Sequence, residues 1–263
     1  MKVLTLNCHS WQEENQREKI RILAETIAER SYDVIALQEV SQLMEAKKVD
    51  DQLKEDNYLL LLIKELHLLG VTDYHYVWDF AHIGFDVYEE GVALLTKHPI
   101  RKTHSFVVSQ SKDPANFKTR RIVGLEILYQ NKPMSFYSCH LGWWQDEEEP
   151  FTGQADALCS YVQDHEPVFL MGDFNNAAQI QEEGYHYLLN KGYRDTYELA
   201  LEKDSGITVD GKITGWDDNK RDLRIDYIFT NKRLQVKNSA VVFNGENKPV
   251  ISDHFGVEVE ILV

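Results

Sequence analysis

Hydrophobic residues along the chain alternate with polar residues or form short runs, and both patterns are typical of β-strands. Ten segments of this kind are separated by polar or glycine-containing stretches. They predict strands at Val3–Leu6, Val34–Leu37, His75–Phe80, Gly91–Thr96, Ile122–Tyr129, Met134–Ser138, Val168–Met171, Ile225–Phe229, Val236–Phe243 and Phe255–Leu262.

Four further segments place their hydrophobic residues at the three- and four-residue spacing of an amphipathic helix. These predicted helices are Gln16–Glu29, Asp56–Leu69, Gly153–Gln163 and Ile180–Asn190. Ten strands are more than one doubly wound sheet usually holds, so we expect an α/β protein in which two packed sheets carry helices on their outer faces.

The chain of 263 residues shows no internal repeat and no linker, so residues 1–263 are expected to form a single domain. The least regular stretch is Glu202–Arg224, which is polar, contains glycine and includes Trp216. It is interpreted as a functional loop, and a surface insertion is the alternative.

Charge narrows the range of partners. There are 28 Lys and Arg residues against 43 Asp and Glu, which gives a net charge of −15. Such a surface repels polyanions on average, so nucleic acid is not expected to be the main partner. The charge pattern leaves the oligomeric state open.

The cysteines and the apolar segments indicate the compartment. Cys8, Cys139 and Cys159 show no paired spacing, which suits reduced thiols in a cytosolic protein. No apolar run of signal-peptide length follows Met1, and the longest apolar cluster, Tyr58–Leu69, is interrupted by charges and too short for a membrane span. We therefore expect a cytoplasmic protein that does not bind membranes.

Polar side chains follow several predicted strands at the point where each strand ends. Asn7 comes after the first strand and Glu39 after the second, and each taken alone could be an ordinary loop residue. After the strand Val168–Met171 comes Gly-Asp-Phe-Asn, in which a two-residue spacing would place Asp173 and Asn175 on one face of an extended chain.

Three more candidate site residues lie in or near the last two predicted strands that carry motifs and after the predicted strand Met134–Ser138. Asp226 lies inside an apolar run, and a buried acid needs a partner. His254 is adjacent to Asp253, but neighbours in an extended chain face opposite ways, so Asp226 is predicted to pair with His254. His140 follows the strand Met134–Ser138 and has a structural role as its simplest interpretation.

Taken together, these motifs resemble the endonuclease/exonuclease/phosphatase (DNase I-like) superfamily. They are Leu-Asn at 6–7, Gln-Glu at 38–39, His140, Gly-Asp-Phe-Asn at 172–175, Ile-Asp-Tyr-Ile-Phe at 225–229 and Ser-Asp-His at 252–254. Their order along the whole chain makes chance matches an inadequate explanation. The resemblance implies a four-layer α/β/β/α sandwich of two mixed sheets flanked by helices.

A narrower resemblance is carried by His9–Glu14, Tyr88–Leu95 and His140–Trp144. These segments are similar to the bacterial branch of the superfamily that includes maltose 6'-phosphate phosphatase. That branch implies hydrolysis of a phosphomonoester of a small metabolite, such as a sugar phosphate.

The resemblance also implies roles for individual residues. Glu39, with Asn7 and Asp253, would hold Mg²⁺, for which Mn²⁺ could substitute, and oxygen ligands suit both ions. Asp173 and Asn175 would position the attacking water and a phosphate oxygen. His254, oriented by Asp226, would act as a base or stabilise developing charge, while His140, held by Glu90, would contact the phosphate. For Glu90, a solvated acid at the end of a strand is the alternative.

Substrate contacts are predicted from charge and aromatic content. Lys118, Arg120 and Arg121 form the densest basic run, and Arg121 is taken as the candidate phosphate contact, with an ordinary surface position for the run as the alternative. Trp143 and Trp144 follow His140 and could stack on a sugar ring, although burial is the simpler interpretation.

Three other functions fit parts of the sequence less well. A nuclease acting on DNA phosphodiesters should have a dense basic stripe, and a sphingomyelinase-like phospholipase should have an amphipathic element for the lipid interface. A non-catalytic binding protein with this scaffold would be expected to have lost some of the motif residues, yet all of them are present.

Overall fold

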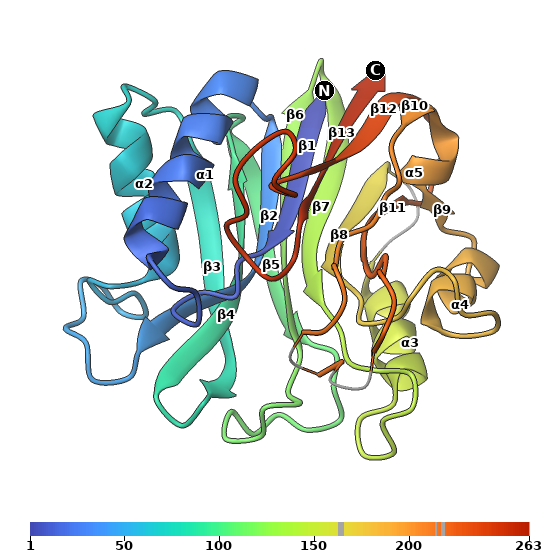
Figure 1. Ribbon diagram of the computed structural model, residues 1–263, viewed down its shortest axis with the longest axis horizontal. Helices are drawn as coiled ribbons and strands as arrows, with labels where there is room; N and C mark the ends of the chain where they lie inside the picture. The colour runs from blue at the N-terminus through green and yellow to red at the C-terminus, as the bar shows by residue number, and fades with distance from the viewer. Residues whose placement is uncertain (163–165, 214, 217–218, 263) are drawn as a thin grey trace.

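The computed structural model describes residues 1–162, 166–213, 215–216 and 219–262. Within them, two mixed β-sheets pack face to face and helices cover the outer face of each sheet (Figure 1). The expected four-layer α/β/β/α sandwich is confirmed.

The first sheet has seven strands in the described part of the chain, in the order β10-β12-β13-β1-β2-β4-β3. The parallel pairs are β1–β2 and β10–β12, and the other neighbours are antiparallel. In that order the strands are Ala200–Lys203, Gln235–Val242, Gly256–Leu262, Lys2–Asn7, Val34–Leu43, Tyr88–Thr96 and His75–Gly84.

The second sheet has six strands among the described residues, in the order β5-β6-β7-β8-β11-β9. Only β7 and β8 are parallel there. The strands are Ile100–Val107, Arg121–Tyr129, Lys132–His140, Val168–Asp173, Asp226–Thr230 and Arg194–Asp195.

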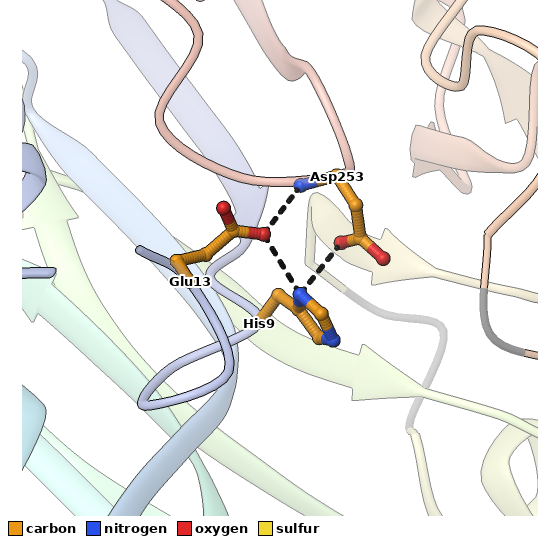
Figure 2. A group of neighbouring side chains, drawn as sticks. All are labelled: His9, Glu13 and Asp253. Carbon is orange, nitrogen blue, oxygen red and sulfur yellow. Dashed lines mark hydrogen bonds and ion pairs between the residues drawn. The ribbon is translucent and has the colours of Figure 1, made fainter. Parts of the chain in front are cut away.

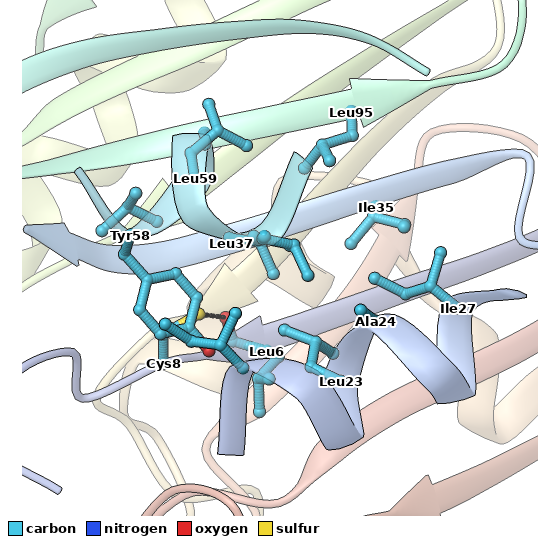
Figure 3. Close-up of a cluster of buried hydrophobic side chains, with 14 of the residues drawn as sticks. Leu6, Cys8, Leu23, Ala24, Ile27, Ile35, Leu37, Tyr58, Leu59 and Leu95 are labelled. Carbon is cyan, nitrogen blue, oxygen red and sulfur yellow. Dashed lines mark hydrogen bonds between the residues drawn. The ribbon is translucent and has the colours of Figure 1, made fainter. Parts of the chain in front are cut away.

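Helices cover both sheets. On the seven-stranded sheet lie α1 (Gln16–Arg30) and α2 (Tyr58–Leu68), whose apolar side chains pack on β1, β2 and β4 (Figure 3). On the six-stranded sheet lie α3 (Phe151–Tyr161) and α4 (Gly184–Asn190). None of the described helices combines the length and apolar character needed to cross a membrane.

All ten predicted strands and all four predicted helices have a counterpart, with shifted ends. The predicted end of the third helix at Gln163 lies outside the described residues, and α4 begins at Gly184 rather than at Ile180. The elements not predicted are β5, β9, β10 and the one-turn helix α5 (Thr196–Leu199). Of these, β5 is an edge strand in which only His104 is buried, so it lacks the apolar alternation that reveals a strand.

The space between the sheets is filled by one face of each central strand. Met134 and Phe136 of β7 and Phe169 and Met171 of β8 belong to this inner core. Because side chains alternate along a strand, positions two residues further on share the same face. In β8 that position is Asp173, and in β7 the same series leads through Ser138 to His140.

The same alternation operates on β1 and β11. Val3 and Ile228 belong to the inner core, and their faces continue to Asn7 and Asp226. Polar side chains from both sheets therefore lie together at one end of the inner core.

Glu39 reaches this end of the core by a different route. Between Leu37 and Val40 the pairing of β2 with β4 slips by one residue, which makes a β-bulge. Glu39 occupies the bulge with φ +52°, a left-handed conformation that is uncommon for a residue other than glycine. Bulges re-aim side chains next to functional sites, and this one turns Glu39 toward Asn7.

Gly172 is required by the close approach of β7 and β8. Its φ is +148°, and a Cβ atom there would lie 1.9 Å from the carbonyl oxygen of Cys139. Backbone cannot withdraw from such a contact without separating the two strands, since Cys139 and Gly172 are register partners.

We expect Gly172→Ala to lower the free energy of unfolding by at least about 3 kcal/mol, because it combines backbone strain with a backbone clash. The matched control is Gly153→Ala in α3, where a Cβ would meet nothing within 4 Å. That variant should gain up to about 1 kcal/mol from helix propensity. Urea denaturation measures both, and equal effects in the two variants would contradict the account of Gly172.

Candidate active site

A cleft of about 390 Å³ opens where the inner core ends. Eight of the twelve residues predicted for the site line it. They are Glu39, Glu90, His140, Trp143, Asp173, Asn175, Asp253 and His254. Asn7 and Asp226 lie directly behind them, in contact with Asp173 or His254.

His254 and Asp226 form the pair predicted from the sequence. The Nδ1 atom of His254 lies 3.0 Å from Oδ2 of Asp226, and both residues are buried. The other ring nitrogen, Nε2, lies 3.8 Å from Oδ2 of Asp173. Burial opposes a charge on the ring, but Asp226 and Asp173 together hold the pKa of His254 well above its usual value.

Asp173 and Asn175 also converge, although not because the chain is extended. Asn175 is left-handed, with φ +49°, and its backbone N–H donates to Oδ1 of Asp173 at 2.8 Å. Its side-chain amide donates to the carbonyl oxygen of Leu141 at 3.0 Å and accepts from Nε1 of Trp216 at 3.2 Å. The loop Glu202–Arg224 thus reaches the site through Trp216, while its residues 214, 217 and 218 lie outside the described residues.

Asn7 links two of the acids. Its Nδ2 donates to Oε1 of Glu39 at 2.8 Å and to Oδ2 of Asp173 at 3.2 Å. Burial raises the pKa of Asp173 to about 7, with His254 opposing the shift and Asp226 adding to it. Burial, with Glu90 and Asp253 nearby, raises the pKa of Glu39 to about 8. Both carboxylates therefore lack full compensation from the protein.

Asp253 is fixed by the segment that follows β1. Figure 2 shows His9, Glu13 and Asp253 in contact: Nδ1 of His9 lies 2.8 Å from Oε1 of Glu13 and 3.5 Å from Oδ1 of Asp253. The backbone N–H of Asp253 donates to the same Glu13 oxygen at 3.1 Å, and Lys19 pairs with the other. These contacts fasten the loop carrying Asp253 to the loop carrying His9.

The oxygen donors of this region fit a hard divalent cation. Glu39 and Asp253 both line the cleft and raise each other's energy when ionised, which a cation between them would relieve. The carboxylate of Glu13 has His9 and Lys19 as partners, so it needs no ion. Asn7 faces Glu39 with its amide nitrogen, so in this structure it supports Glu39 and does not offer its oxygen there.

His140 lies between the carboxylates of Asp173 and Glu90, and Glu90 in turn contacts a second histidine, His82. Its Nε2 is 3.7 Å from Oδ2 of Asp173 and its Nδ1 is 4.0 Å from Oε1 of Glu90. Glu90 is nearer to His82, whose Nε2 is 3.3 Å away. Glu90 and His140 are therefore close, as expected, but they are too far apart for a hydrogen bond. Glu90 is within hydrogen-bonding distance of His82 instead.

His82 escapes sequence analysis because the hairpin that pairs it with Glu90 has no usual turn sequence. The register of β3 and β4 sets His82 opposite Glu90, and the turn between them contains Phe85 and Asp86. Asn-Gly or Asp-Gly would have indicated a two-residue turn. Without that signal, the cross-strand pair could not be derived.

Arg120, not Arg121, lines the cleft, which corrects the predicted phosphate contact. The guanidinium of Arg121 is held by Asp79 of β3 at 3.2 Å and by Ser105 of β5 at 2.9 Å. Arg120 precedes β6 and is 4% exposed, and its Nε has no hydrogen-bond partner in the described part of the chain. Of these two neighbouring arginines, Arg120 therefore points into the cleft and Arg121 contacts the edge strands of the two sheets.

The two tryptophans also separate. Trp143 lines the cleft, and the guanidinium of Arg120 lies 5.8 Å from the centre of its ring. Trp144 instead packs against Phe151 of α3 and Tyr187 of α4, outside the cleft. The substrate contact predicted for Trp144 is wrong, because its indole completes the outer core.

Comparisons with known proteins identify the family and the fold. The family model described as the Endonuclease/Exonuclease/phosphatase family matches residues 4–254. An endonuclease/exonuclease/phosphatase family protein from Leptotrichia buccalis C-1013-b is 46% identical, with a TM-score of 0.94 over 100% of both chains. No curated protein matches the chain.

More distant structures share the fold. The mannosyl-6-phosphatase Bt3783 from Bacteroides thetaiotaomicron VPI-5482 is 18% identical, with a TM-score of 0.72 over 100% of both chains. A humanised TDP2 from D. rerio is 14% identical, with a TM-score of 0.64 over 100% of this chain and 99% of the other. Since the family model covers nearly the whole chain, this protein belongs to the endonuclease/exonuclease/phosphatase family.

Proposed function

We propose that this protein is a Mg²⁺-dependent hydrolase of phosphomonoesters whose substrate is a small metabolite, namely a sugar phosphate of the maltose 6'-phosphate type. The observation that carries the proposal is the buried guanidinium of Arg120 in the same cleft as His140, Asp173 and His254. A cytoplasmic location, expected from the sequence, belongs to the proposal.

Arg120 favours an anion with more than one charge. Burial lowers its pKa, and Glu90, Asp173 and Glu39 act on it as nearby charges that are not hydrogen-bonded to it. A guanidinium offers several donors in a planar fork that matches phosphate oxygens. A phosphomonoester dianion presents three terminal oxygens, whereas a diester presents two and one charge fewer, so the monoester gains more from Arg120.

The residues around Glu39 would hold the metal. Glu39 and Asp253 supply carboxylate oxygens, and Asn7 is the neighbouring amide. A bound Mg²⁺ would neutralise charge on the phosphoryl oxygens. Mn²⁺, which also takes oxygen ligands, is the expected substitute.

The remaining residues handle the water and the phosphoryl group. Asp226 holds Nδ1 of His254, so Nε2 faces Asp173 and the cleft. Asp173, fixed by Asn7 and Asn175, would orient the attacking water in line with the ester bond. Because Asp226 and Asp173 hold the pKa of His254 well above its usual value, His254 would be protonated and would stabilise developing charge. The carboxylate of Asp173, whose pKa is raised to about 7, would take the proton from that water, and His140 would donate to a phosphoryl oxygen. No covalent phosphoenzyme is required.

Three observations support a small metabolite as substrate. The cleft of about 390 Å³ is in the size range of sites for small molecules. The net charge of −15 disfavours a polyanion. A protein that shares the fold is named a mannosyl-6-phosphatase.

Removal of the Glu39 charge should weaken Mg²⁺ binding by at least about tenfold, because loss of one carboxylate removes charge from a site with few protein ligands. In Glu39→Gln the side chain keeps an oxygen to accept from Asn7, so the variant should fold normally. Glu198→Gln, at a surface acid paired with Lys203, is the control. Isothermal titration calorimetry with MgCl₂ gives both affinities, and an unchanged value in Glu39→Gln removes Glu39 from the metal site.

Arg120→Gln should lower kcat/KM for p-nitrophenyl phosphate by about 100-fold or more, the usual effect of losing one donor to a charged transition state. The loss for bis(p-nitrophenyl) phosphate should be at least about tenfold smaller, since less charge is to be held. Arg121→Gln is the matched control and should change neither substrate's kcat/KM by more than about threefold. Equal losses for monoester and diester would contradict the role of Arg120 in selecting monoesters.

A further inference from the structure

Two large aromatic side chains stand exposed at the outer end of the cleft. Phe85 is 58% exposed and Phe117 is 55% exposed, and both line the cleft that contains His140 and Asp173. Phenyl rings at a cleft mouth leave apolar surface in water, and such surface commonly marks a place where a ligand binds. Neither ring takes part in the phosphoryl chemistry described above.

The backbone that carries Phe85 is unusual. The turn between β3 and β4 is closed by the Val87 N–H, which donates to the Gly84 carbonyl oxygen at 3.2 Å. Its two central residues, Phe85 and Asp86, have φ +51° and +60°. Asn or Gly would adopt these angles more readily, and a bulky residue with positive φ is an outlier. This chain carries a phenyl group at this position in spite of that strain, which points to a use for the ring.

The loop that carries Phe117 is fastened to the same hairpin. The backbone N–H of Ile83 donates to the carbonyl oxygen of Pro114 at 2.7 Å, and Nδ1 of His82 lies 3.0 Å from the carbonyl oxygen of Thr119. These bonds hold the segment 114–119 beside the end of β3. The two phenyl rings therefore belong to one connected rim.

The rim is also tied to the loop that carries Trp143. Lys118, next to Phe117, forms ion pairs with Asp146 and Glu148. The indole N–H of Trp143 is buried and has no acceptor among the described residues. An acceptor supplied by a ligand in the cleft would satisfy this donor.

We propose that Phe85, Phe117 and Asp86 form a subsite for the pyranose ring of the substrate, outside the position of the phosphate. The inference rests on the proposed function, and it adds the residues that select the group attached to the phosphate. Aromatic rings pack on the C–H face of a pyranose. The exposed carboxylate of Asp86, which lines the same cleft, accepts hydrogen bonds from sugar hydroxyls and repels a second phosphate.

The experiment compares substrates that share the phosphate and differ in the attached group. Phe85→Ala, Phe117→Ala and the double variant are assayed on maltose 6'-phosphate, glucose 6-phosphate, adenosine 5'-monophosphate and methyl phosphate. Leu201→Ala, at a side chain that is 80% exposed in β10, is the control. Both phenyl side chains are more than half exposed, so the variants should keep the wild-type Tm.

We expect the double variant to raise KM for the two sugar phosphates by about tenfold or more, with kcat within about threefold and kcat/KM for methyl phosphate unchanged. Wild-type KM values in the double variant for both sugar phosphates would overturn the subsite. A larger effect on adenosine 5'-monophosphate than on either sugar phosphate would assign the rings to a nucleobase and also overturn it.

Failure of the proposed function gives a different result. In that case the wild-type protein hydrolyses none of the four monoesters, methyl phosphate included. Calorimetric titration of maltose 6'-phosphate then decides the subsite, since a tenfold weaker affinity in the double variant supports it. Equal affinity for wild type and double variant, or no binding to wild type, overturns it.

Discussion

Burial of negative charge in one cleft is the constraint on which the rest of the site depends. In the part of the chain that the structure describes, Glu39, Glu90, Asp173, Asp226 and Asp253 gather at the end of the inner core. Taking carboxylates out of water costs several kcal/mol each unless partners compensate. The basic groups of the site, which are His9, His82, His140, His254 and Arg120, lie among these acids.

Basic partners compensate some of these buried carboxylates more fully than others, and this difference indicates the chemistry that the site can perform. Asp226 has His254. Burial opposes ionisation of Glu90, but His82, together with Arg120 and His9, outweighs burial and holds the pKa of Glu90 below its usual value. Glu39 and Asp173 have pKa values raised to about 8 and about 7. Carboxylates whose charge is not fully compensated by the protein are suited to bind a cation or to orient a water molecule. The buried guanidinium of Arg120, which lines the same cleft, is suited to bind the phosphate.

The sandwich makes such a costly arrangement possible. The inward faces of β1, β7, β8 and β11 are apolar along most of their length and become polar at one end. Packing of the inner core fixes the strands, and the strands fix the acids. The same rigidity supports uncommon backbone conformations at Glu39, Asn175 and Phe85, all of which line the cleft.

Sequence patterns are sufficient for the parts of this design that follow a strand period. Asn7, His140 and Asp173 each stand at the end of a strand that the sequence predicts. Asp226 lies inside an apolar run and so requires a partner, which His254 supplies. Asn175 lies beside Asp173, but a left-handed turn brings it there and not the extended chain that its spacing predicts.

Features that depend on register or on a single loop position could not be derived. His82 requires the register of a hairpin with no usual turn sequence, and Trp144 requires the position of α3 and α4. The choice between Arg120 and Arg121 depends on where β6 begins. The edge strand β5 lacks apolar alternation because little of it is buried.

The central claim is tested most directly by phosphate release from a panel of sugar phosphates, nucleotides and short DNA, with Mg²⁺ and with EDTA. The account predicts Mg²⁺-dependent release from sugar phosphates, little or none from DNA, and loss of activity in EDTA. Activity confined to DNA, or full activity on sugar phosphates in EDTA, would contradict it.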